Sequence, residues 1–390
     1  MRRNIALPVF LAALLTVTLF AAIYYGMSSS RSEAGQVDVF VGVDVAHDNV
    51  TSLKARVDEV KDYTNFFVIG SSGITTNRDK LDDVCQYLYD SGLHFTTYTH
   101  TVVNSTLTEF NQTVQSDWIN TAKQKWNGKF WCLYPYDEPG GHQIDRDEPY
   151  MIVPNPSGNY SDVADKYVET LSNIYLSEFK AYNMPLLTSD YALYEFDYKA
   201  GYDVVLAEYA WNHSRPLNTA LCRGAATMHG KEWGVMITYT YDAPPYLASG
   251  DEIYQDMVTA YENGAKYIIV FDYAKDKDTN ITHGILQPEH LEALKNFWQY
   301  SKEHPRTPSP ASDRTAYVLP AGYGYGFRGP NCSLWGLPTP DNNSATIWND
   351  LNTLLNQNQP NADIIYEDTL EYGANAYREL VFWNRTTITK

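Results

Sequence analysis

Short apolar runs alternate with amphipathic segments along most of the chain. Between residues 37 and 300, runs rich in β-branched and aromatic residues, which suit a pleated and half-buried surface, are separated by segments with apolar residues at helical spacing. Strands are predicted at 37–45, 65–70, 94–99, 130–136, 185–189, 203–209, 232–241 and 266–272. Eight strand–helix pairs over roughly 250 residues are typical of a (β/α)8 barrel. The pattern therefore predicts an α/β fold containing a TIM barrel; the alternative, a doubly wound open sheet, would need fewer strands.

The connection after the fourth predicted strand is unusually long. Residues 141–159 are rich in acids and prolines and predict an irregular excursion that could form one wall of a cleft. Residues 161–182 follow as one predicted helix, with apolar residues on one face.

A shorter alternation follows the barrel. A proline-rich linker is predicted at 305–312, then strands at 315–319, 362–366 and 379–383 and a helix at 345–356, which together form a small three-layer α/β unit. Between its first strand and helix, the glycine-rich segment 322–330 could cradle a phosphate, but a turn-rich loop packing aromatic residues on the barrel is favoured. The predicted domains are 1–35, 36–304, the linker 305–312, and 313–390.

The N-terminal segment has the composition of an export signal. Arg2 and Arg3 precede residues 5–27, an uncharged apolar run long enough to span a bilayer. A signal anchor is favoured over a cleaved signal peptide, and residues 28–35 suit a tether. Many Asn-X-Ser/Thr acceptor sequences accompany this segment. We therefore expect a glycoprotein outside the cell or at its surface, attached to the membrane through the N-terminal segment if that segment is uncleaved.

Charge and composition narrow the range of partners. The net charge of −18 argues against nucleic acid as a partner. Aromatic residues reach 14% and include 32 tyrosines; these suit sugars because the ring packs on C–H faces while the hydroxyl forms hydrogen bonds. The four cysteines show no CxxC spacing, so they predict no zinc site. Neither another metal nor a cofactor is expected. Free buried thiols and a disulfide both remain open for them.

Candidate chemistry lies where the fourth predicted strand ends. Asp137 and Glu138 follow it directly, and Pro139, Gly140 and Gly141 are expected to turn the chain away. Ligands of parallel α/β sheets bind at this end of the strands. Other polar or aromatic residues at predicted strand ends are His100, Glu208, Trp211, Tyr239, Tyr241 and Asp272.

Carboxylates between aromatic walls suit glycoside hydrolysis, in which one acid protonates the leaving oxygen and a second carboxylate acts from the opposite face. Glu138 and Glu208 are the predicted catalytic pair. Structural interpretations stay open: Glu208 could be a buried ion-pair partner, and Asp272 could only cap its strand. The predicted substrate-binding residues are Tyr136, Asp137, His100, Trp211, Tyr239, Tyr241 and Asp272.

The motif Tyr136-Asp137-Glu138-Pro139 resembles the Asn-Glu-Pro motif of the large clan of retaining glycosidases built on this barrel. The resemblance implies that Glu138 is the acid/base and that Asp137 stands where the clan's Asn touches the sugar 2-hydroxyl. The clan's nucleophile is a Glu ending the seventh strand, but here that strand leads to Asp242. Asp242 could substitute, and Glu208 is favoured.

The C-terminal unit is similar to the glutamine-amidotransferase-like domain of some β-galactosidase families. It lacks that domain's nucleophile cysteine, which implies a non-catalytic role. Two functions therefore remain: an extracytoplasmic glycoside hydrolase, or a non-catalytic glycan-binding or cell-surface structural protein on the same scaffold.

Overall fold

The computed structural model describes residues 38–99, 112–210, 212–238, 247–273, 286–358 and 360–389. The predictions for residues 1–35 and for His100, Trp211, Tyr239 and Tyr241 lie outside these ranges. Among the described residues, no helix is long and apolar enough to cross a bilayer.

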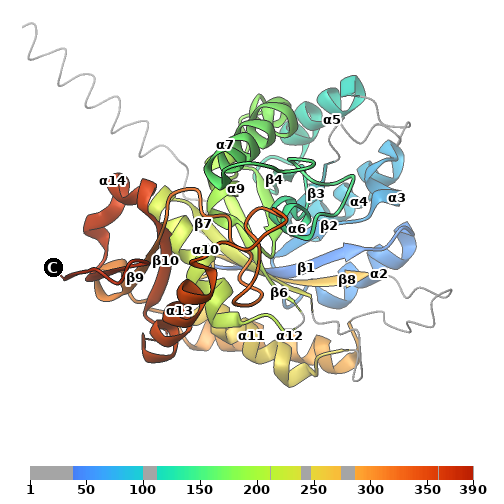
Figure 1. Cartoon of the computed structure of the whole chain (residues 1–390). Helices are drawn as coiled ribbons and strands as arrows, with labels where there is room; N and C mark the ends of the chain where they lie inside the picture. The colour runs from blue at the N-terminus through green and yellow to red at the C-terminus, as the bar shows by residue number, and fades with distance from the viewer. Residues whose placement is uncertain are drawn as a thin grey trace, which may run out of the picture. The chain divides into compact units, whose positions relative to one another are not determined.

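Eight parallel strands form the predicted barrel, in the order β4-β3-β2-β1-β8-β7-β6-β5 (Figure 1). A parallel bridge between Leu133 and Leu186 joins the two ends of this order and closes the ring. The (β/α)8 prediction is confirmed. The strands are β1 (Phe40–Ala46), β2 (Phe66–Ile69), β3 (His94–Tyr98), β4 (Phe130–Tyr134), β5 (Leu187–Asp190), β6 (Val204–Ala210), β7 (Glu232–Thr238) and β8 (Tyr267–Tyr273).

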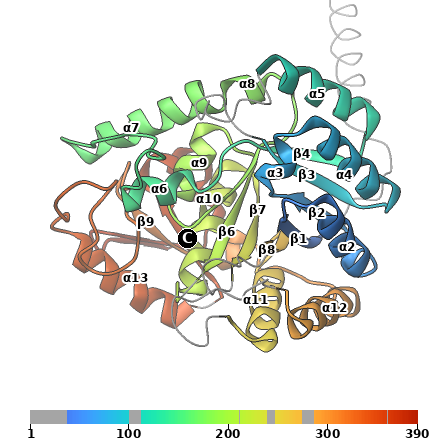
Figure 2. The same cartoon turned by 90° about the vertical axis from the view of Figure 1, so that its right-hand side faces the viewer.

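The helices surround the strands (Figure 2). The larger ones are α2 (Val50–Val60), α4 (Arg78–Asp90), α5 (Gln112–Lys125), α7 (Tyr160–Thr170), α9 (Tyr194–Ala200), α10 (Arg215–His229), α11 (Gly250–Glu262) and α12 (Pro288–Glu303); the short ones are α3 (Ser72–Thr75), α6 (Pro139–Asp145) and α8 (Ser177–Lys180). The helix predicted at 161–182 is not continuous, because a π-helical turn at Leu171–Tyr175 separates α7 from α8.

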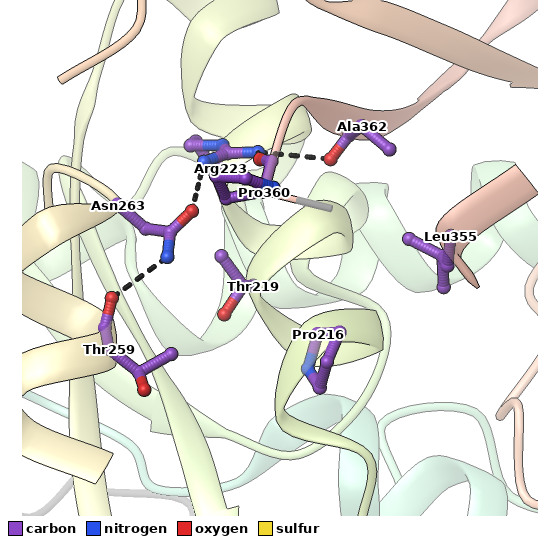
Figure 3. A pocket seen from close by; sticks show the side chains of 8 residues that line it. All are labelled: Pro216, Thr219, Arg223, Thr259, Asn263, Leu355, Pro360 and Ala362. Carbon is purple, nitrogen blue, oxygen red and sulfur yellow. Dashed lines mark hydrogen bonds between the residues drawn. The ribbon is translucent and has the colours of Figure 1, made fainter. Parts of the chain in front are cut away.

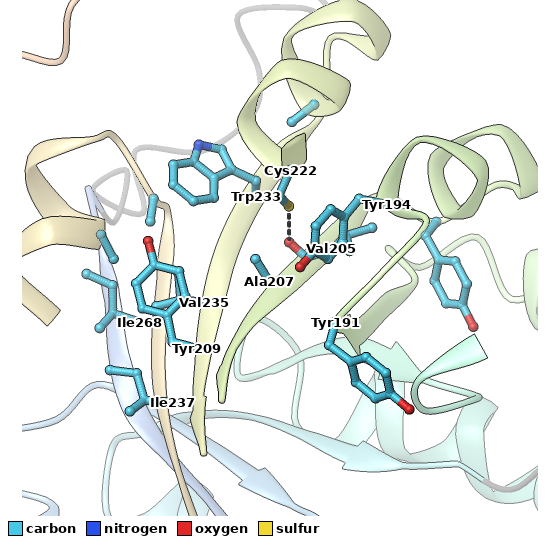
Figure 4. Close-up of a cluster of buried hydrophobic side chains, with 14 of the residues drawn as sticks. Tyr191, Tyr194, Val205, Ala207, Tyr209, Cys222, Trp233, Val235, Ile237 and Ile268 are labelled. Atoms are coloured by element: carbon cyan, nitrogen blue, oxygen red, sulfur yellow. Dashed lines mark hydrogen bonds between the residues drawn. The ribbon is translucent and has the colours of Figure 1, made fainter. Parts of the chain in front are cut away.

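Successive residues of each barrel strand point alternately outward, toward the helices, and inward, into the barrel. Outward residues such as Val205, Ala207 and Tyr209 of β6 pack under the helices (Figure 4). Inward, the ring of Phe40 packs on those of Trp131 and Tyr267, each with centroids 5.0 Å away. Because aromatic side chains fill the N-terminal end, the polar inward residues gather at the C-terminal end.

The C-terminal residues form a second sheet in the order β10-β9-β11-β12. Its first three strands are parallel to their neighbours and β12 is antiparallel to β11. Helices α13 (Ser344–Asn358) and α14 (Leu370–Gly373) accompany it. The strands are β9 (Thr315–Leu319), β10 (Ala362–Tyr366), β11 (Glu379–Phe382) and β12 (Thr387–Thr389).

Helix α10 contacts both sheets, because it covers the barrel strands β6 and β7 and also packs on β10. A Cβ added to Gly224 would lie 2.2 Å from the carbonyl oxygen of Ile364, so only glycine allows this approach. The Arg223 guanidinium donates to Asp363 Oδ1 at 2.7 Å and to Asn263 Oδ1 at 2.6 Å, beside a small crevice of about 280 Å³ (Figure 3). Residues Val39–Lys390 thus form one unit.

Two further predictions concern the cysteines and the segment after β4. All four cysteines are free thiols, and Cys85, Cys132 and Cys222 are buried. The segment after β4 is not irregular throughout, because Pro139 occupies the first turn of α6, where its missing N–H costs nothing.

Candidate active site

A hydrogen-bonded polar cluster lies at the C-terminal end of the barrel interior. Ser189 of β5 stands at its centre: the Tyr134 hydroxyl donates to its Oγ at 2.9 Å. The Ser189 hydroxyl lies 2.8 Å from Glu208 Oε1 and 3.0 Å from Asp137 Oδ1. Glu208 is only 3% exposed. The ends of β4 and β6 therefore bring carboxyl groups, and β5 a hydroxyl group, into one buried site.

Glu138 follows β4 in a backbone conformation that favours glycine. Its φ of 49° and ψ of 43° are left-handed, which costs a non-glycine residue roughly 1–3 kcal/mol. The Glu138 N–H donates to the Ser189 carbonyl at 3.0 Å, and Pro139 starts α6 immediately afterwards. The carboxyl group of Glu208 lies close enough to that of Glu138 to raise its pKa. The strained backbone thus directs Glu138 at the buried cluster.

Asp190, at the end of β5, anchors the beginning of α6. Its carboxylate accepts the N–H groups of Gly140 at 2.5 Å and Gly141 at 2.8 Å. A Cβ on Gly140 would lie 2.4 Å from the Ala192 carbonyl, and one on Gly141 would lie 2.1 Å from the Tyr191 ring. The expectation that these glycines turn the chain away was wrong: they let a helix start against β5.

Burial dominates the electrostatics of this site. It raises the pKa of Glu138, and the charges of Glu208 and Asp137 raise it further. The pKa of Glu208 is raised by burial and then by Asp137. The pKa of Asp137 is also raised by burial, although hydrogen bonds from Tyr134 and Ser189 oppose the shift. Two neighbouring carboxyl groups resist carrying a negative charge at the same time. The Glu138–Glu208 pair therefore keeps a proton near neutral pH.

His142 links Glu138 to the rim. Its Nε2 lies 3.9 Å from Glu138 Oε2 and its Nδ1 lies 2.9 Å from Asp147 Oδ2. The ring stacks on Tyr150, with centroids 5.1 Å apart. Sequence reasoning did not select His142; its place four residues after Glu138 was the signal, once a helix is known to start there.

The C-terminal unit also holds α6. Arg328 pairs with Asp145, with Nη2 to Oδ2 at 2.9 Å, and Gln143 Nε2 donates to the Trp335 carbonyl at 3.1 Å. Tyr325 and Phe327 are buried with their ring centroids 4.5 Å apart. The interpretation of 322–330 as an aromatic loop on the barrel is confirmed.

The structure brings Asp137, Glu138 and Glu208 together, but two other predicted residues point elsewhere. Tyr136 packs in the core, and its hydroxyl donates to the Tyr150 carbonyl at 2.7 Å. Asp272 is fully buried, with Arg56 Nε 2.9 Å and His47 Nε2 3.2 Å away. Alternation along β8 places it on the outer face of the barrel wall, away from the polar cluster.

Sequence reasoning missed several residues that build the site. They are Asp44, Tyr134, Ser189 and His142. Within the described ranges, no cluster of three or more His, Cys, Asp or Glu residues could hold a metal ion.

The parallel barrel is the feature that this chain shares with known proteins. No family model and no curated protein matches the sequence. Among solved structures, GH5_18 from Bifidobacterium longum subsp. longum in complex with Manb1-4GlcNAc superposes with a TM-score of 0.54 and 11% identity, covering 90% of this chain and 97% of that one. A second structure of GH5_18 from the same organism gives a TM-score of 0.51 at 11% identity, covering 90% and 98%. The likeness shows the fold, and these structural neighbours are glycoside hydrolases.

Proposed function

We propose that this protein is a glycoside hydrolase in which Glu138 protonates the oxygen of the glycosidic bond. The position of Glu138 at the C-terminal end of the barrel carries the proposal, together with its pKa, which burial and the charges of Glu208 and Asp137 raise. A general acid must hold its proton at the working pH, and burial beside a second carboxyl group is how proteins achieve this.

We assign Glu208 a role other than the second reacting carboxylate. It is only 3% exposed and raises the pKa of Glu138, so it fits a partner that keeps the proton on Glu138. The carboxylate that attacks the anomeric carbon, or activates water, then comes from another position. Asp242, which follows β7 and lies outside the described residues, is the candidate.

In the proposed reaction, Glu138 gives its proton to the leaving oxygen as the bond to the anomeric carbon breaks. A water molecule supplies the hydroxyl group to that carbon and a proton back to a carboxylate, so protons balance over one turnover. Asp137, bonded to Ser189, is placed to contact the sugar nearby.

Hydrolysis of a glycan panel by Glu138→Gln tests this proposal. The substitution keeps the shape and removes the acid, so turnover should fall by roughly 10²- to 10⁴-fold while sugar binding persists. Glu195→Gln is the comparison, since Glu195 is a buried glutamate of α9 that pairs with His229 rather than with a carboxyl group of the cluster. Sugar binding without hydrolysis by the wild type would favour the non-catalytic glycan-binding function instead.

We further propose that the folded body lies outside the cytoplasm, anchored by residues 5–27. The apolar run and the glycan acceptor sequences support this. Protease added to intact cells should remove the body, whereas complete protection would place it inside.

A further inference from the structure

Asp44 of β1 is a buried carboxyl group that the proposed reaction does not use. Phe40, Gly42 and Asp44 alternate onto the inner face of the barrel, with Phe40 in the aromatic layer at the N-terminal end. Asp44 is therefore the inward polar side chain nearest the C-terminal end of β1, where the charges of Asp137 and Glu208 act on it. It is only 5% exposed.

Unlike its neighbours, Asp44 is not held by the protein. Its Oδ1 makes no hydrogen bond among the described residues, whereas Asp137 and Glu208 both lie within hydrogen-bond distance of the Ser189 hydroxyl. A buried polar atom left unpaired costs about 1–3 kcal/mol. Such a cost is typical of a group kept for a ligand.

The backbone opposite Asp44 leaves room for this carboxyl group. A Cβ on Gly70 would lie 2.1 Å from Asp44 Oδ1, so any larger residue there would displace it. The position of the Asp44 carboxyl group inside the barrel therefore depends on glycine at position 70.

The surroundings define the ligand chemistry. The pKa of Asp44 is raised by burial first, and then by the charges of Asp137, Asp272 and Glu208. A protonated carboxyl group has one O–H donor and a free acceptor, which matches a hydroxyl group that also donates and accepts. The neighbouring acids would repel a carboxylate or phosphate.

We propose that Asp44 binds a hydroxyl group of the substrate sugar. This is the sugar unit whose glycosidic oxygen Glu138 protonates. The inference rests on the proposed function and adds to it a substrate class: a neutral sugar with a free hydroxyl directed along the barrel axis.

Calorimetric titration with free glucose, mannose, galactose and N-acetylglucosamine tests the proposal on the whole chain. An amide donates and accepts as a protonated carboxyl does, so Asp44→Asn should keep the wild-type affinity within about threefold. Asp44→Val has a similar shape without polar atoms and should weaken binding by about tenfold or more. Neither variant should melt below the wild type, because no protein hydrogen bond at Oδ1 is lost.

Asp363→Asn is the matched control. Asp363 is also fully buried, but it is held by Arg223, Arg314 and Tyr377, so this variant should lose stability and keep sugar affinity. Unchanged affinity in Asp44→Val, or equal loss of affinity and melting temperature in both Asp44 variants, overturns the assignment of Asp44 alone. If the wild type binds none of the four sugars, the proposed function fails and this inference fails with it.

Discussion

At the scale of single residues, burial keeps carboxyl groups of the site protonated, and this lowers the stability of the folded state as pH rises. Burial and then Asp137 raise the pKa of Glu208 from 4.5 to about 8. Burial also raises the pKa of Asp190, to about 7. Each group is neutral in the folded state at a pH where the unfolded chain has ionised it. The folded state therefore binds more protons, and stability falls as pH rises.

The pH dependence of stability is a direct test. The free energy of unfolding should fall between about pH 4.5 and pH 8, with up to about 1.4 kcal/mol per pH unit from each such group. Glu208→Gln cannot ionise, so its stability should decline less steeply over the same window. Urea denaturation at pH 5, 6.5 and 8 measures both slopes. Parallel profiles for the two proteins would show that Glu208 ionises normally in the folded state.

Residue-level sequence reasoning expected Glu138 and Glu208 at one end of the barrel, where the structure has them, but it did not foresee that Tyr136 and Asp272 point away from them. Strand ends can be read from composition, which is why both acids were found. The side to which a residue points depends on where the strand begins in the barrel, and an error of one position reverses it. Asp272 is one such reversal, because it faces Arg56.

At the scale of elements, helix α6 depends on a residue that is distant in sequence. Asp190 lies on β5, yet it binds the first amides of α6 and so fixes Glu138. The sequence Pro139-Gly140-Gly141 has the local appearance of a break. No local pattern could reveal this helix, because its capping group comes from another strand. The eight strands could be predicted since their signal is their own composition.

Asp190→Ala should therefore affect catalysis as well as stability. Loss of a helix cap costs about 0.5–2 kcal/mol, and freeing the start of α6 should also lower turnover on the substrate that the glycan panel identifies. Asn159→Ala is the comparison, because the Asn159 side chain caps α7, which carries none of the carboxyl groups of the site. That variant should lose similar stability and keep its turnover. Equal turnover in the two variants would leave Asp190 with a purely structural role.

At the scale of the whole molecule, the barrel and the second sheet are joined by packing around α10. Alanine is normally better than glycine inside a helix by about 1 kcal/mol. At Gly224 the order should reverse, because a Cβ would meet the Ile364 carbonyl at 2.2 Å. Gly224→Ala should thus lose about 1–3 kcal/mol. Gly329→Ala, where nothing lies within 4 Å of the added Cβ, should change little. Thermal melts compare them, and a more stable Gly224→Ala would show that β10 can retreat without cost.

The shared helix also limits how this chain could have been assembled or could be engineered. An enzyme with a detachable second module can gain, lose or exchange that module through a cut in its linker. Here a cut at 305–312 would separate the chain but not the contacts, since Arg223 of α10 and Asp363 of β10 would remain facing partners. Shuffling either half with a foreign partner would leave a buried charge uncompensated, so the two halves have to be inherited and redesigned together.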